Sequence, residues 1–237
     1  KGYVLKTIGM IGGLSWESSA EYYRMINEAV KSRLGGLHSA QTLMFSFDFA
    51  EIEQLQHEGR WDIATERMID AAQRLERGGA DVLIICSNTM HRMAAEVQVS
   101  ISIPLIHIVD AAAVRIKASG LRRVGLLATI YTMEQDFYRG RLTDQHGLDV
   151  IVPNAEDRQI VNRIIFDELV LGVIKPESKL EYLRVVSSLI AQGAEGVILG
   201  CTEIGLLIKQ ADCPIPAFDT TEIHALAAVE MALEAQS

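Results

Sequence analysis

The chain has 237 residues, 49% hydrophobic and 6% aromatic, so it can bury an aliphatic core and is not disordered. Its formal charge is −9 and it contains no basic run, which argues against nucleic acid and anionic membrane as partners. No apolar stretch approaches the roughly 18–20 residues of a membrane span, and residues 1–6 do not suggest a signal peptide. Cys86, Cys201 and Cys213 are odd in number and irregularly spaced, so we expect a reduced, cytoplasmic protein without a zinc site.

In the first half of the chain, short β-branched runs alternate with longer amphipathic segments, which is typical of βαβ units and a parallel sheet. The expected strands are residues 7–11, 41–47, 82–86 and 103–107. The expected helices are residues 16–33, 61–78 and 88–97. Ser15 is the expected cap of the first helix, and Gly12-Gly13 forms the turn before it.

The same cycle restarts in the second half. Its expected strands are residues 123–127, 149–152 and 197–200, and its expected helices are residues 134–146, 157–171 and 176–192. Ala128-Thr129 stands where Gly12-Gly13 stood, 116 positions earlier.

One segment occurs twice. Residues 79–89 align without gaps on residues 193–203, 114 positions later, and residues 103–106 recur as 215–218 at an offset of 112. We therefore expect an α/β fold of two similar parallel-sheet domains related by a pseudo-twofold axis, with the active site in the cleft between them. The first domain is expected to span residues 1–112 and to be joined by a C-terminal helix at 217–237; the second spans 113–216.

Each copy of the repeat ends its apolar strand in a small nucleophilic residue, Ser87 in the first and Cys201 in the second. Ligands of open parallel sheets bind beyond the carboxyl ends of the strands, where these residues fall. Two such groups could transfer protons at the two opposite faces of one substrate carbon, one group removing a proton and the other supplying one. Short donors beside backbone amides suit the binding of carboxylates, although capping and turn chemistry explains the same residue types. These donors are Asn88, Thr89, Thr129, Thr132 and Thr202.

The chain resembles the aspartate/glutamate racemase family over essentially its whole length. The residues that carry the resemblance are Met10-Ile11-Gly12-Gly13, Ser87-Asn88-Thr89 and Gly200-Cys201-Thr202-Glu203, and residues 12–18 and 131–138 look like the enterobacterial amino-acid racemase branch. The resemblance implies racemisation of an aspartate- or glutamate-like amino acid without pyridoxal phosphate, metal or other cofactor. It also implies one cysteine on each face of the α-carbon, and relatives are often homodimers, an option that the sequence leaves open.

The chain departs from the family pattern at Ser87, which stands where the first cysteine belongs. A hydroxyl is a far weaker acid than a thiol and is rarely a base without an activating partner. Cys86 is one residue away, but neighbours at a strand end point to opposite faces. We therefore expect Cys201 to be the principal base, helped toward a thiolate by nearby donors, and Ser87 to relay a proton or merely cap a helix. By resemblance, Cys201 faces the α-hydrogen of the L form, so L substrates should react faster.

The remaining candidates each have a functional interpretation and a purely structural one. Met10 is a core residue by type, although the family places a residue here against the substrate, and Gly12 and Gly13 suit any tight turn. Glu203 either tunes Cys201, contacts the substrate ammonium or simply favours a helix start. The basic pair that grips the side-chain carboxylate in many relatives has no counterpart at residues 46–48 or 169–172, so substrate choice stays open.

Two rival functions remain. One is decarboxylation or isomerisation of dicarboxylates, which needs a single thiol. The other is a binding protein that lost turnover when serine replaced the first cysteine. The retention of Cys201 and Glu203 argues against pure binding, because binding alone does not require a thiol.

Overall fold

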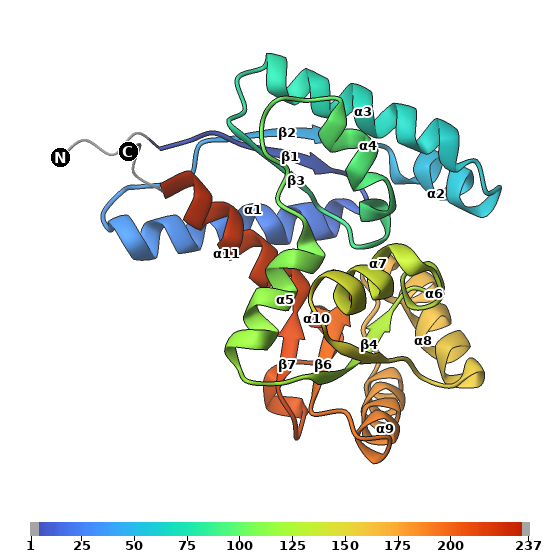
Figure 1. Ribbon diagram of the computed structural model, residues 1–237. Coiled ribbons are helices and arrows are strands. Elements are labelled where there is room, and N and C mark those ends of the chain that lie inside the picture. The colour runs from blue at the N-terminus through green and yellow to red at the C-terminus, as the bar shows by residue number, and fades with distance from the viewer. Residues whose placement is uncertain (1–4, 234–237) are drawn as a thin grey trace. The chain divides into compact units, whose positions relative to one another are not determined.

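The computed structural model describes residues 5–233. The described chain forms two compact units (Figure 1). Unit 1 comprises residues 5–107 and 224–233, and unit 2 comprises residues 108–223. The boundaries expected from the sequence, after residues 112 and 216, lie five residues later and seven residues earlier than these. No helix of the described residues is long and apolar enough to cross a membrane.

The sheet of unit 1 has three parallel strands in the order β2-β1-β3. These are β1 (Ile8–Gly12), β2 (Thr42–Ser46) and β3 (Val82–Ile85). The strand expected at residues 103–107 is wrong, because only a single bridge, between Leu83 and Leu105, forms there. Pro104 has no backbone N–H to extend the ladder, and the chain leaves the sheet directly for a helix.

The helices of unit 1 cover both faces of its sheet (Figure 1). They are α1 (Trp16–Leu34), α2 (Phe49–His57), α3 (Trp61–Arg77), η1 (Thr89–Met93), α4 (Ala94–Val99) and the part of α11 (Thr220–Leu233) that follows residue 223. Ser15 caps α1 as expected, its side chain accepting a hydrogen bond of 3.3 Å from the backbone N of Ser18. The C-terminal helix begins at Thr220 and not at 217, because Ala217–Asp219 forms a strand.

Successive side chains of a strand point to opposite faces of the sheet, so the core of unit 1 lies in two layers. Ile8, Met10 and Cys86 face α1 and α11, whereas Ile11 and Ile85 face α3, η1 and α4. All five side chains are fully buried. Burial of both faces explains why these strands read as continuous apolar runs.

The sheet of unit 2 has four parallel strands in the order β5-β4-β6-β7. They are β4 (Arg123–Ala128), β5 (Asp149–Ile151), β6 (Gly196–Gly200) and β7 (Ala217–Asp219). The helices are α5 (Ile108–Ala118), α6 (Ile130–Glu134), α7 (Asp136–Gly140), η2 (Arg141–Gln145), α8 (Ala155–Asp167), η3 (Leu169–Leu171), α9 (Pro176–Ala191), α10 (Ile204–Leu207) and η4 (Gln210–Asp212).

The single helix expected at residues 134–146 is wrong. Gln135 is extended, with φ −91° and ψ 150°, and it separates α6 from α7. A π-helical segment, η2, then continues from α7. Amphipathic spacing alone does not report such a break, because apolar residues keep their order on both sides of it.

The offsets of the sequence repeat match the strand pairing of the two sheets. Ile8 pairs with Val82 in unit 1, and the positions 116 and 114 residues later, Val124 and Gly196, pair in unit 2. Both units place their first strand between the second and the third. The repeat therefore records the same strand order and register in each sheet.

Side-chain hydrogen bonds are repeated as well. The amide oxygen of Gln98 accepts a 2.7 Å bond from the backbone N of Leu105. The amide oxygen of Gln210 accepts a 2.7 Å bond from the backbone N of Ala217, and both residues lie 112 positions after their counterparts. Each glutamine thus fixes the segment that borders the third strand of its own sheet.

Candidate active site

In unit 2, the predicted site residues gather at the carboxyl edge of two neighbouring strands. Ala128 of β4 is in register with Gly200 of β6. The next residues, Thr129 and Cys201, therefore leave adjacent strands that run about 4.8 Å apart. Figure 1 shows α6, α7 and α10 at these strand ends.

Cys201 is nearly buried and lies against a carboxylate. Its side chain is 8% exposed, and its Sγ lies 3.0 Å from Oε2 of Glu203. The same carboxylate oxygen accepts a 2.6 Å hydrogen bond from Oγ1 of Thr202. Cys201, Thr202 and Glu203 therefore form one hydrogen-bonded group at the end of β6.

Burial raises the pKa of the Cys201 thiol well above its usual value, and the negative charge and hydrogen bond of Glu203 raise it further. Backbone N–H groups of Glu203 and Ile204 favour the thiolate but do not outweigh these effects. The sequence-based expectation of a ready thiolate at neutral pH is therefore wrong for the free protein. The thiol is the stable form, and its proton is donated in a hydrogen bond to the carboxylate of Glu203.

Thr129 organises the turn after β4. It is the N-cap of α6, and its Oγ1 accepts a hydrogen bond of 3.4 Å from the backbone N of Thr132. The two hydroxyls are 3.2 Å apart, and both side chains are buried. Asn162, which the sequence did not single out, accepts from the backbone N of Ile130 at 2.8 Å. Asn162 comes from α8, so no local motif could have indicated this contact.

In unit 1, the Gly12-Gly13 turn is held tightly against the segment that follows β2. Gly13 has φ +70°, and a Cβ at this position would collide with the backbone N and O of Phe47. The backbone N of Phe47 donates to the carbonyl of Gly12 at 3.0 Å, and Oγ of Ser19 accepts from the N of Gly13 at 2.8 Å. Only glycine satisfies both the positive φ and this close approach.

Ser87 follows β3, and its hydroxyl accepts a hydrogen bond from the first turn of η1. The backbone N of Met90 donates to Ser87 Oγ at 3.4 Å. His91 binds the backbone of Ser87 and not its hydroxyl. Its Nδ1 lies 2.6 Å from the carbonyl oxygen of Ser87 and donates to it. The described contacts of Ser87 thus give its hydroxyl no basic partner.

Cys86 lies in the core. Its side chain is fully buried, and burial raises the pKa of its thiol far above the usual value. Met10, expected at the substrate by resemblance, occupies the same core layer with 0% exposure. Asn88 and Thr89 are buried beside Ser87 at the start of η1.

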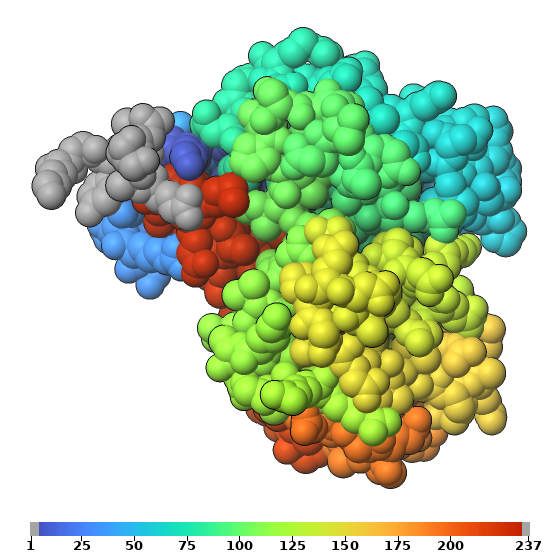
Figure 2. Space-filling view, viewed as in Figure 1, coloured from blue at the N-terminus to red at the C-terminus, as the bar shows by residue number. Residues whose placement is uncertain are grey.

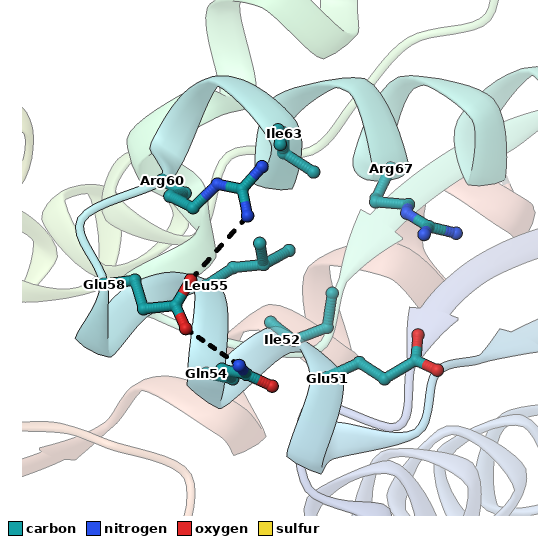
Figure 3. Close-up of a pocket in the computed structure, with 8 residues that line it drawn as sticks. All are labelled: Glu51, Ile52, Gln54, Leu55, Glu58, Arg60, Ile63 and Arg67. Atoms are coloured by element: carbon teal, nitrogen blue, oxygen red, sulfur yellow. Dashed lines mark hydrogen bonds and ion pairs between the residues drawn. The ribbon is translucent and has the colours of Figure 1, made fainter.

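A separate cavity of 350 Å³ lies on unit 1 between α2 and α3 (Figure 3). In it, Glu58 accepts from Nε2 of Gln54 at 2.8 Å and lies 3.8 Å from Arg60, with both charged side chains at least 40% exposed. None of the predicted site residues lines it. Its lining residues are Glu51, Ile52, Gln54, Leu55, Glu58, Arg60, Ile63 and Arg67.

These features define a class of protein with two parallel α/β units, one of which carries a thiol–carboxylate pair at its carboxyl edge. The model of the Asp/Glu/hydantoin racemase family matches residues 11–228, and the chain belongs to that family. The expectations of an α/β racemase fold and of an isomerase are thereby confirmed at the level of the family.

Individual relatives agree with this assignment. A crystal structure from Yersinia pestis, provisionally described as an Asp/Glu racemase, is 53% identical, with a TM-score of 0.90 over 97% of this chain and 100% of that one. An aspartate racemase homologue from Pyrococcus horikoshii OT3 is 38% identical, with a TM-score of 0.84 and the same coverage. The broad specificity amino-acid racemase RacX of Bacillus subtilis is 26% identical over 74% of this chain and 75% of its own.

Proposed function

We propose that the protein is a cofactor-independent amino-acid racemase that acts on aspartate- or glutamate-like substrates, with Cys201 as the base. The observation that carries this proposal is the 3.0 Å contact between the Cys201 thiol and the Glu203 carboxylate at the end of a parallel strand. A binding function needs no thiol there. Family membership supports the reaction class.

The raised pKa of Cys201 requires that its proton leave before the thiol acts as a base. Glu203 is the acceptor, since its carboxylate already receives the hydrogen bond from Sγ. An incoming substrate ammonium adds positive charge, which stabilises the thiolate relative to the thiol. The thiolate then removes the α-proton, and the electron pair is delocalised into the substrate carboxylate.

Return of a proton to the opposite face, with release of the proton on Glu203 to water, completes racemisation. In our proposal Ser87 relays this proton from water, since a hydroxyl without a base partner donates or relays but does not abstract. The reaction is consequently faster from the L form, whose α-hydrogen faces Cys201, than from the D form. The equilibrium constant stays at one, which makes kcat/KM equal for the two enantiomers, so the bias appears only in initial rates at saturating substrate.

Proton NMR in D₂O with L- and D-aspartate and L- and D-glutamate tests the proposal. Cys201→Ala should lower α-proton exchange by roughly 10²- to 10⁴-fold. Cys213→Ala is the matched control, because Cys213 is also 8% exposed and belongs to the same unit, and it should leave exchange unchanged.

Ser87→Cys tests the asymmetry. A second thiol should raise the initial rate from the D form toward that from the L form. Equal initial rates from saturating concentrations of both enantiomers in the unaltered protein would refute the single-thiol mechanism. Release of carbon dioxide from malonates without amino-acid exchange would assign the site to decarboxylation.

A further inference from the structure

Three arginines of residues 5–233 are half-buried, and one of them lacks a polar partner. Arg141 binds Asp110 through two hydrogen bonds of 2.7 and 2.6 Å, and Arg158 binds Glu134 at 2.8 Å. Arg139 has no ion pair or hydrogen bond to any described residue, and its Nε is a buried donor without an acceptor. Neither cation–π contact of the described residues involves it.

The lack of a partner is not caused by a shortage of carboxylates nearby in the sequence. Asp136 precedes Arg139 by three residues, and both it and Asp144 are exposed. On α1, Arg24 pairs at 2.6 Å with Glu21, also three residues before it. Arg139 makes no such pair, and its guanidinium is held partly out of water instead.

A half-buried guanidinium without an acceptor is costly. Arginine keeps its charge at any accessible pH, and removing a charge from water is unfavourable unless a counter-charge and hydrogen bonds replace the solvent. Buried polar atoms without partners are rare in native proteins, so each one calls for a specific explanation. A carboxylate ligand would supply the missing acceptors, because its two oxygens match the guanidinium fork.

Arg139 lies in the segment that leaves the catalytic edge of unit 2. The chain passes from Thr129, beside Cys201, through α6 into α7, which carries Arg139, and α6 and α7 are in contact. Figure 1 shows both helices over the ends of β4 and β6, on the same side as α10.

We infer that Arg139 binds the side-chain carboxylate of an acidic amino-acid substrate and so determines the preference for aspartate or glutamate over their amides. This inference rests on the proposed racemase function. The guanidinium donates two N–H···O hydrogen bonds to the carboxylate. An uncharged side-chain amide offers one oxygen and no charge, and is bound less tightly.

Kinetics of α-proton exchange with L-aspartate and L-asparagine test the inference in Arg139→Met and Arg139→Lys. Arg139→Met should lower kcat/KM for aspartate by roughly 10- to 100-fold, mainly through KM, and leave asparagine almost unchanged. Arg139→Lys keeps the charge and should recover part of the loss. Arg158→Met is the control, since Arg158 already has a protein partner, and it should not alter the ratio of the two substrates.

Calorimetric titration of the same proteins with both amino acids separates the two proposals. If the unaltered protein exchanges neither substrate but binds aspartate, and Arg139→Met abolishes that binding alone, the racemase proposal fails and the Arg139 assignment stands. An unchanged aspartate-to-asparagine ratio in Arg139→Met overturns the assignment. An equal loss in Arg158→Met, or no binding of aspartate by the unaltered protein, overturns it as well.

Discussion

Replacement of His224 by glutamine should make unit 1 less sensitive to acid. His224 is fully buried on α11, where its Nε2 lies 2.8 Å from the carbonyl oxygen of Ile106 and therefore carries a proton. Its Nδ1 then accepts from the hydroxyl of Tyr22 at 2.8 Å. Both contacts suit a neutral ring, and an amide side chain offers the same donor and acceptor without titrating.

The size of the effect follows from the pKa. Burial, with a smaller contribution from His91, lowers the pKa of His224 from 6.5 to about 3. Between pH 6.5 and 3, His224 is protonated in the unfolded chain but not in the folded protein. The contribution of His224 to the free energy of unfolding is therefore complete above pH 6.5 and is lost as the pH falls toward 3. At 1.36 kcal/mol per pKa unit the full loss is roughly 4–5 kcal/mol, and about 2 kcal/mol of it should appear by pH 5.

Urea denaturation at pH 7.5, 6 and 5 measures this loss. Both tryptophans, Trp16 and Trp61, belong to unit 1, so their fluorescence follows its unfolding. The free energy of unfolding should fall less steeply with acid in His224→Gln than in the unaltered protein. His57→Gln, which replaces an exposed histidine of the same unit, should keep the original slope. Parallel slopes for His224→Gln and the unaltered protein would refute the reasoning.

Two further substitutions test other parts of the structure. Glu203→Gln removes the charge that raises the pKa of Cys201, so alkylation of this cysteine by iodoacetamide should begin roughly 1–3 pH units lower; an unchanged profile would exclude the coupling. Gly59→Ala places a Cβ in open space at φ +69° and should cost about 1–2 kcal/mol, whereas Gly13→Ala also collides with Phe47 and should cost more. Thermal unfolding compares the two variants, and equal losses would show that the collision is relieved elsewhere.

The sequence was sufficient for the features that repeat. The repeat predicted two similar α/β halves, and corresponding residues of the two sheets do pair in the same register. It also predicted that Cys201 follows a buried strand. The raised pKa of Cys201 was not predictable, because residue spacing reveals neither the depth of burial nor the rotamer that brings Glu203 to 3.0 Å.

Arg139 was missed for a related reason. In the sequence it stands among charged residues and looks like any solvated arginine. Only coordinates show that Asp136 and Asp144 leave it without a partner while Arg141 and Arg158 are paired. Whether a charged side chain is paired depends on which side chains lie near it in space, and a sequence pattern does not give these positions.

The hydrogen bond from His224 to Ile106 closes a chain segment of 118 residues, which contains the whole of unit 2. Unit 2 is thus an insertion whose two ends leave unit 1 at neighbouring points. Joining such distant residues in an unfolded chain costs entropy, and prior folding of the intervening segment shortens the effective loop. Docking of α11 onto unit 1 should therefore follow the folding of unit 2. If a short linker replaced residues 108–223, unit 1 should fold without waiting for unit 2.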